Sequence, residues 1–132
     1  MNGYLLDSHL LLWTAKPEDV VRLGENARMI IEDADTKLFV STISVYELTY
    51  KHHLGKLPEY AIVVRQLNDV IKTLGATELP VSNAHAEAAG ALDWEHRDPF
   101  DRILAAQAQV EQLVLITSDA ALRDCSLIRT LW

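Results

Sequence analysis

The sequence contains a single cysteine, Cys125, which excludes an internal disulfide and a cysteine-based metal cluster. No apolar run approaches the roughly eighteen residues that a membrane-spanning helix needs. The first residues carry no basic stretch and Asp7 follows soon after, so we expect no signal peptide. Internal repeats, low-complexity tracts and Gly/Ser-rich linkers are also missing. These absences favour one domain over residues 1–132, located in the cytoplasm and without a membrane partner.

Basic residues are in deficit. The chain has 12 Lys and Arg against 19 Asp and Glu, which gives a formal net charge of -7. This balance argues against nonspecific nucleic-acid binding, which normally requires a positive surface. Acids that cluster around a bound cation are an exception, because the cation changes the sign of the local field.

Apolar residues are plentiful, and their pattern predicts the class of fold. They make up 49% of the chain, which excludes disorder and supplies one hydrophobic core. Short apolar runs predict strands over residues 4–6, 37–40, 77–79 and 113–117, with an edge strand over 127–132. Helical periodicity or capping residues predict helices over 8–13, 25–35, 43–53, 58–74, 84–92, 99–112 and 120–124. This alternation is typical of an α/β sandwich with a mainly parallel sheet, in which ligands bind beyond the carboxyl ends of the strands.

The segment 96–102, with the sequence His-Arg-Asp-Pro-Phe-Asp-Arg, precedes a buried helix. Asp98 has the position of an N-cap and Pro99 that of the first helical residue. Asp101 falls in the first turn, near the positive end of the helix dipole. One interpretation is a variant capping box that only starts the helix. The other is that Asp101 belongs to a group of acids around a metal ion.

Three further acids decide between these interpretations. Asp7 and Asp119 each follow a predicted strand, and each could instead cap the helix that comes next. Glu47 lies within an apolar stripe of the helix 43–53, where an unpaired charge is costly unless it binds a metal. Its alternative partner is Lys51, one helical turn further on. Together with Asp101 these acids form a set of oxygen ligands suited to Mg²⁺ and to phosphodiester cleavage.

The chain resembles a known family in four segments, which occur in the family's order. They are residues 5–9 (Leu-Leu-Asp-Ser-His), 44–48 (Ser-Val-Tyr-Glu-Leu), 97–108 (from Arg-Asp-Pro-Phe-Asp-Arg to Ala-Gln-Ala) and 115–119 (Leu-Ile-Thr-Ser-Asp). The family is that of the PIN domains, in particular the VapC-type ribonuclease toxins of bacterial toxin–antitoxin pairs. The third segment is the most specific, and the resemblance covers nearly the whole chain.

The resemblance implies a three-layer α/β/α domain and a metal-dependent endoribonuclease that cleaves RNA by metal-activated water. It implies that Mg²⁺ or Mn²⁺ is surrounded by Asp7, Glu47, Asp101 and Asp119, with Asp98 as an additional acid. A hydroxyl beside the last acid, from Thr117 or Ser118, would orient an acid or a water. It also implies a cognate antitoxin protein as partner.

Other residues extend these expectations. RNA phosphates could be contacted by Lys51, Lys56, Arg97 and Arg102, although cations also suit solvated helix ends. Arg102 could alternatively pair with Asp98, four residues earlier. His9 and His96 lie near acids, where we expect local hydrogen bonds rather than proton transfer. The apolar face of the segment 58–74 suggests a homodimer or an antitoxin contact.

Two other functions compete with RNA cleavage. The first is a non-catalytic RNA- or protein-binding domain of the same PIN fold. The presence of all four matched acids argues against it. The second is a phosphate-receiving signalling domain. That class has adjacent acids after its first strand, whereas Ser8 follows Asp7 here.

Overall fold

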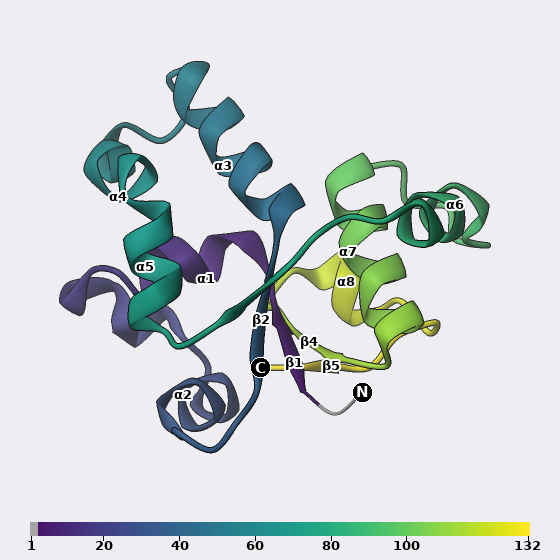
Figure 1. Cartoon of the computed structure of the whole chain (residues 1–132), viewed down its shortest axis with the longest axis horizontal. Helices are drawn as coiled ribbons and strands as arrows, with labels where there is room; N and C mark the ends of the chain where they lie inside the picture. The colour runs from purple at the N-terminus through teal and green to yellow at the C-terminus, as the bar shows by residue number, and fades with distance from the viewer. Residues whose placement is uncertain (1–2) are drawn as a thin grey trace.

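The computed structural model describes residues 3–132, and a parallel sheet forms its centre (Figure 1). The strands are β1 (Tyr4–Leu6), β2 (Leu38–Ser41), β3 (Thr77–Leu79), β4 (Val114–Ile116) and β5 (Thr130–Leu131). Their order is β3-β2-β1-β4-β5, and every pairing is parallel. The expected α/β class is therefore confirmed, and the sheet is entirely rather than mainly parallel.

Helices lie on both sides of this sheet (Figure 1). One side carries α1 (Ser8–Trp13), the 3₁₀ helix η1 (Pro17–Arg22), α2 (Glu25–Glu32), the 3₁₀ helix η2 (Pro58–Tyr60), α4 (Ala61–Arg65) and α5 (Leu67–Thr73). The other side carries α6 (Asn83–Ala91), α7 (Pro99–Glu111) and α8 (Ala120–Arg123). Helix α3 (Thr42–His53) rises beyond the carboxyl end of β2 and contacts α1, α4 and α7. No helix among residues 3–132 is both long enough and apolar enough to cross a membrane.

The central strands β1, β2 and β4 are apolar on both faces because the sheet separates two hydrophobic cores. Leu6 packs into a core with Leu10 and Leu11 of α1. Leu5, the preceding residue of the same strand, packs into a second core with Leu104 of α7. Alternate side chains of a strand point to opposite faces, so continuous apolar runs are what a sheet covered on both sides requires.

The expected continuous helix over 58–74 is wrong. The segment forms η2, α4 and α5, with Gln66 between the last two at φ -122° and ψ 26°. The Gln66 N–H donates to the Val63 carbonyl at 2.9 Å, three residues back, which tightens the chain into a turn. The turn buries both halves of the apolar face inside the protein, since Val63 and Leu67 are 8% and 5% exposed.

Two predicted elements also differ from the observed ones by more than two residues at one end. The helix expected over 25–35 ends at Glu32, because Asp33 accepts a hydrogen bond from the Asp35 N–H and starts a turn. The edge strand expected over 127–132 shrinks to the two residues of β5.

We expect the replacement Leu5→Ala to lower the free energy of unfolding by about 2–5 kcal/mol, because Leu5 is fully buried in the central strand. Ile62→Ala is the matched control, since Ile62 is 70% exposed and should change stability by less than about 0.5 kcal/mol. Urea denaturation measures both values. Equal losses for the two variants would contradict the described core.

Candidate functional site

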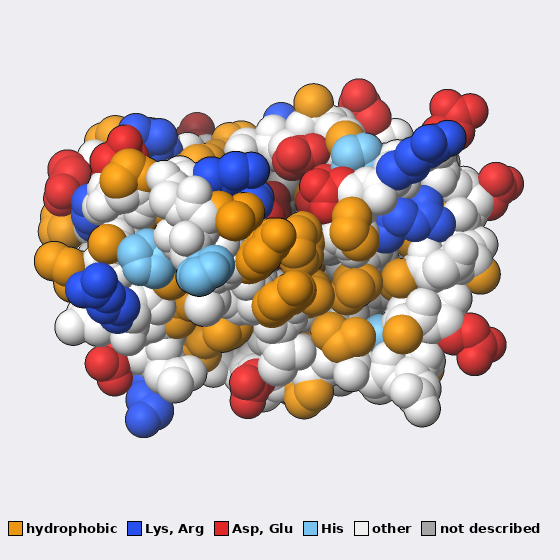
Figure 2. All heavy atoms as spheres, turned by 90° about the horizontal axis from the view of Figure 1, so that it is seen from above, with side chains coloured by type: hydrophobic (Ala, Val, Ile, Leu, Met, Phe, Trp, Pro, Cys, Tyr) orange, Lys and Arg blue, Asp and Glu red, His pale blue; other side chains and the backbone are white. Residues whose placement is uncertain are grey.

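The predicted acids lie at the carboxyl end of the sheet. Asp7 directly follows β1 and Asp119 follows the neighbouring strand β4. Glu47 lies on α3, the helix that leaves β2 on the other side of β1, and Asp101 lies in the first turn of α7. Figure 2 looks onto this end of the molecule, where acidic side chains gather near the middle with Lys or Arg side chains on either side.

Asp7 is buried between two hydrogen-bond donors. Its Oδ1 accepts from the Ser8 N–H at 2.7 Å, and its Oδ2 accepts from the Thr117 hydroxyl at 2.7 Å. Burial raises the pKa of Asp7, and these two bonds oppose the rise. The Thr117 oxygen also accepts from the Asp119 N–H at 3.0 Å, so one hydroxyl links the two acids. Of the two expected hydroxyls, Thr117 makes these contacts, while Ser118 is exposed.

Glu47 is also buried, and its two oxygens face different partners. Its Oε1 accepts from the Ser8 hydroxyl at 2.8 Å, and its Oε2 contacts the Lys51 ammonium. The Ser8 oxygen lies 2.9 Å from the Ser44 hydroxyl. Ser8 has one hydroxyl proton and donates it in the hydrogen bond to the Glu47 carboxylate. In the contact between the two serines, Ser44 is therefore the donor and Ser8 the acceptor. The sequence reasoning assigned no role to these two serines, although both lie inside the segments that resemble the PIN domains.

Asp101 pairs with a histidine. The His96 Nε2 lies 2.7 Å from Asp101 Oδ2, which is a local hydrogen bond of the kind expected for His96. Burial first, and then the charges of Asp98, Asp119 and Asp7, raise the pKa of Asp101 to about 6, against the opposing effect of His96. Asp101 therefore interacts electrostatically with the cap of its own helix, Asp98, and with acids from two other segments, Asp7 and Asp119.

Asp98 and Asp119 are helix caps as well as members of this acidic region. Asp98 Oδ1 accepts from the backbone N–H groups of Phe100 at 2.9 Å and Asp101 at 3.3 Å. Asp119 Oδ1 accepts likewise from the backbone N–H groups of Ala121 at 2.9 Å and Leu122 at 3.2 Å in α8. Each cap uses one oxygen of its carboxylate, so the second oxygen of each carboxylate is left for another ligand.

The donor set suits a divalent cation. Burial and mutual repulsion raise the pKa values of Asp7 and Asp101, and a bound cation would offset both costs. Within residues 3–132, one group of at least three such side chains brings its ligand atoms within 4.8 Å of one another: His96, Asp98 and Asp101. The four acids expected from the sequence share one end of the sheet, and of these four only Asp101 belongs to that group.

Arg102 has a structural role that replaces the expected contact with phosphate and the alternative pairing with Asp98. Its guanidinium group donates four hydrogen bonds, at 2.7 to 3.2 Å, to the carbonyls of Ala89, Leu92, Trp94 and His96. Four of its five N–H groups are therefore used, one on α6 and three on the loop between α6 and α7.

The other three predicted cations are placed differently. The Lys51 ammonium forms an ion pair with Glu47, which is the partner that the sequence offered for Glu47 in place of a metal ion. Lys56 and Arg97 are exposed. Arg97 lines an open hollow together with Trp94 and His96, beside Asp101.

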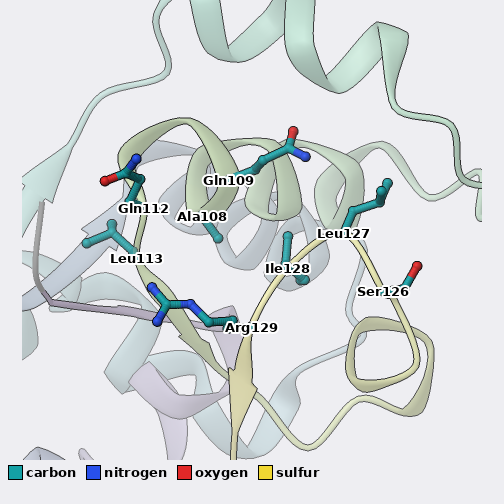
Figure 3. Close-up of a pocket in the computed structure, with 8 residues that line it drawn as sticks. All are labelled: Ala108, Gln109, Gln112, Leu113, Ser126, Leu127, Ile128 and Arg129. Carbon is teal, nitrogen blue, oxygen red and sulfur yellow. The ribbon is translucent and has the colours of Figure 1, made fainter.

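A separate pocket of about 380 Å³ lies at the opposite end of the sheet (Figure 3). It is lined in part by Leu113 and Arg129, which precede β4 and β5. Asp7 and Asp119 instead follow the strands β1 and β4. The length of the strands therefore separates this pocket from the acids, and in parallel sheets ligands bind at the carboxyl end.

Solved structures share this architecture over almost the whole chain. DNA-bound VapBC from Salmonella typhimurium matches with a TM-score of 0.70 and 19% identity, over 99% of this chain and 98% of that chain. VapBC2 from Rickettsia felis, bound to a promoter DNA fragment, matches at 0.65 and 15% over the same shares. VapBC-5 from Mycobacterium tuberculosis, a member of the VapBC family of toxin–antitoxin systems, matches at 0.60 and 17%, over 98% of this chain and 97% of that chain.

At these identities the structures show a common fold. A search of curated protein sequences finds no match. The sequence profile of the PIN domain matches residues 4–126, which is nearly the whole chain. The chain therefore belongs to the PIN domain family.

Proposed function

We propose that the protein is a metal-dependent endoribonuclease and the toxin of a cytoplasmic toxin–antitoxin pair. The observation that carries this proposal is the acidic region at the carboxyl end of a parallel sheet in a PIN domain. Burial and neighbouring carboxylates raise the pKa of Asp101 there, as expected of a site built to receive a cation.

The ion would be Mg²⁺ or Mn²⁺, held by the carboxylates of Asp7, Glu47, Asp101 and Asp119, with Asp98 as an additional candidate. Their oxygens are the ligands that hard divalent cations prefer. When bound, such an ion activates water and stabilises the leaving oxygen of a phosphodiester.

The chain's own residues would prepare this site. The Thr117 hydroxyl orients Asp7, and the Ser8 hydroxyl orients Glu47. Lys51 lies against Glu47, so cation binding there would release its ammonium for an RNA phosphate. Lys56 and Arg97 are further proposed phosphate contacts, because both are exposed.

The proposed partners are an RNA substrate, a cognate antitoxin and a second copy of the chain. The VapBC structures named above support an antitoxin partner. Exposed apolar side chains on the side of the sheet that carries α2 and α4 are the proposed contact for another protein. Val21 is 80% exposed, Met29 65% and Ile62 70%.

The replacement Asp101→Asn should abolish RNA cleavage while the protein stays folded. Loss of a residue that only supports a metal ligand typically costs about 10–100-fold, so a direct ligand should cost at least about 100-fold. The assay uses antitoxin-free protein, structured RNAs and either Mg²⁺ or Mn²⁺. Asp35→Asn, an exposed acid outside the site, is the control and should leave the rate unchanged. No cleavage by the parent protein with either ion, or unchanged cleavage by Asp101→Asn, would refute the proposal.

Metal binding should weaken at acidic pH, because the pKa of Asp101 is about 6 and a proton competes with the ion. Protonation of Asp101 alone should weaken affinity about fourfold between about pH 7.5 and about pH 5.5. Calorimetric titration with Mg²⁺ measures this change. An affinity that does not fall over this interval would contradict the role of Asp101.

The metal-free protein should show the opposite trend in stability. The pKa of Asp101 rises from 3.8 to about 6 on folding, so between these values the folded state binds the extra proton. The free energy of unfolding in chelator should therefore increase as pH falls through about 6. Asp101→Asn should reduce this increase, while Asp35→Asn should preserve it.

A further inference from the structure

The acidic region includes an imidazole that the four-acid proposal does not use. We propose that His96 is a ligand of the metal ion, together with Asp98 and Asp101, and that the centre prefers a transition-metal ion such as Mn²⁺ to Mg²⁺. This inference rests on the proposed metal centre. Asp101 is common to both ligand sets, so His96 and Asp98 extend the centre at the start of α7.

The spacing of the three side chains fits a coordination sphere. Their ligand atoms all lie within 4.8 Å of one another, and His96 Nε2 is 2.7 Å from Asp101 Oδ2. An octahedral ion with ligands at about 2.1 Å places neighbouring ligand atoms about 3.0 Å apart and opposite ones about 4.2 Å apart. Side-chain rotations that displace the ligand atoms by well under an ångström therefore bring His96, Asp98 and Asp101 to that geometry.

The imidazole is held in place by its own loop. Arg102 donates to the carbonyls of His96 and Trp94, which fixes the backbone on which His96 stands. The Trp94 and His96 rings lie 4.8 Å apart, centre to centre. This loop has neither helix nor strand between α6 and α7, so the guanidinium contacts take over the role of regular structure.

The remaining ligands are equally well placed. Asp98 is fixed by capping α7 through one oxygen, and Asp101 is fixed by its position in the first turn of that helix. The His96 side chain is 30% exposed, so an ion can reach the group from solvent. The three side chains are thus held in place by the protein on one side and are accessible from solvent on the other.

The chemistry of nitrogen sets the preference among ions. Mg²⁺ takes oxygen ligands and keeps its waters, whereas divalent ions of the first transition series also bind imidazole nitrogen, Mn²⁺ the most weakly of them. A centre made of carboxylates alone would discriminate less between Mn²⁺ and Mg²⁺. His96 adds affinity for Mn²⁺ and little for Mg²⁺.

The test measures metal binding without RNA, so it gives a result whether or not the protein cleaves RNA. The metal-free protein is titrated with Mn²⁺, followed by electron paramagnetic resonance, and with Mg²⁺, followed by calorimetry. His96→Gln keeps an amide that can donate to Asp101 but lacks the imidazole. We expect its dissociation constant for Mn²⁺ to rise at least about tenfold. The constant for Mg²⁺ should change less than about twofold.

Two controls isolate the role of His96. His53→Gln makes the same change at an exposed position near the end of α3 and should leave both constants unchanged. Pulsed electron paramagnetic resonance of bound Mn²⁺ should show coupling to an imidazole nitrogen, which disappears in His96→Gln and persists in His53→Gln. A hydrogen bond from His96 to Asp101 would not by itself produce this coupling.

A second variant tests Asp98 without removing the helix cap. Asn caps as well as Asp, so Asp98→Asn should fold normally, and we expect it to weaken Mn²⁺ binding at least about tenfold. Unchanged Mn²⁺ affinity in this variant would remove Asp98 from the ligand set. Equal losses of Mn²⁺ and Mg²⁺ affinity in His96→Gln, or no nitrogen coupling in the parent protein, would overturn the inference.

Discussion

The parallel pairing of β1 with β2 on one side and β4 on the other is the constraint on which the acidic region depends. Parallel strands end at the same edge, so the residues that follow them are brought together although they are far apart in the sequence. Asp7 and Asp119 follow two of these strands, and Glu47 lies on the helix that follows the third. The two hydrophobic cores hold the three strands in register, and thereby hold the acids close.

Carboxylates that lie close together repel one another, and the surrounding residues offset part of this cost. Hydroxyl groups from Thr117 and Ser8 donate to the buried carboxylates of Asp7 and Glu47. Lys51 supplies one positive charge against Glu47. The pKa of Asp101 is nevertheless about 6, because burial and, after it, the charges of Asp98, Asp119 and Asp7 leave a residual cost to its charged form. That residual cost is what a bound cation would relieve.

Helix capping and ion binding are compatible in the same residues. Asp98 and Asp119 each use one oxygen to cap a helix, and this contact fixes where the rest of the carboxylate points. Arg102 extends the same principle to the loop before α7, because its four bonds to carbonyls hold His96 beside Asp101. Groups that stabilise local structure thus also set the geometry of the region.

The sequence by itself determined the α/β class, most of the element positions and the acids at the strand ends, because apolar periodicity and capping residues are local signals. It did not predict the break at Gln66, since burial of both halves of the segment decides it. It offered Arg102 as a contact for phosphate or a partner for Asp98, and did not predict that the side chain binds carbonyls of a neighbouring loop. That Thr117 donates to Asp7, and Ser8 to Glu47, emerged only in the tertiary structure. Contacts between segments as distant as Asp7 and Thr117 depend on strand order, which no local pattern encodes.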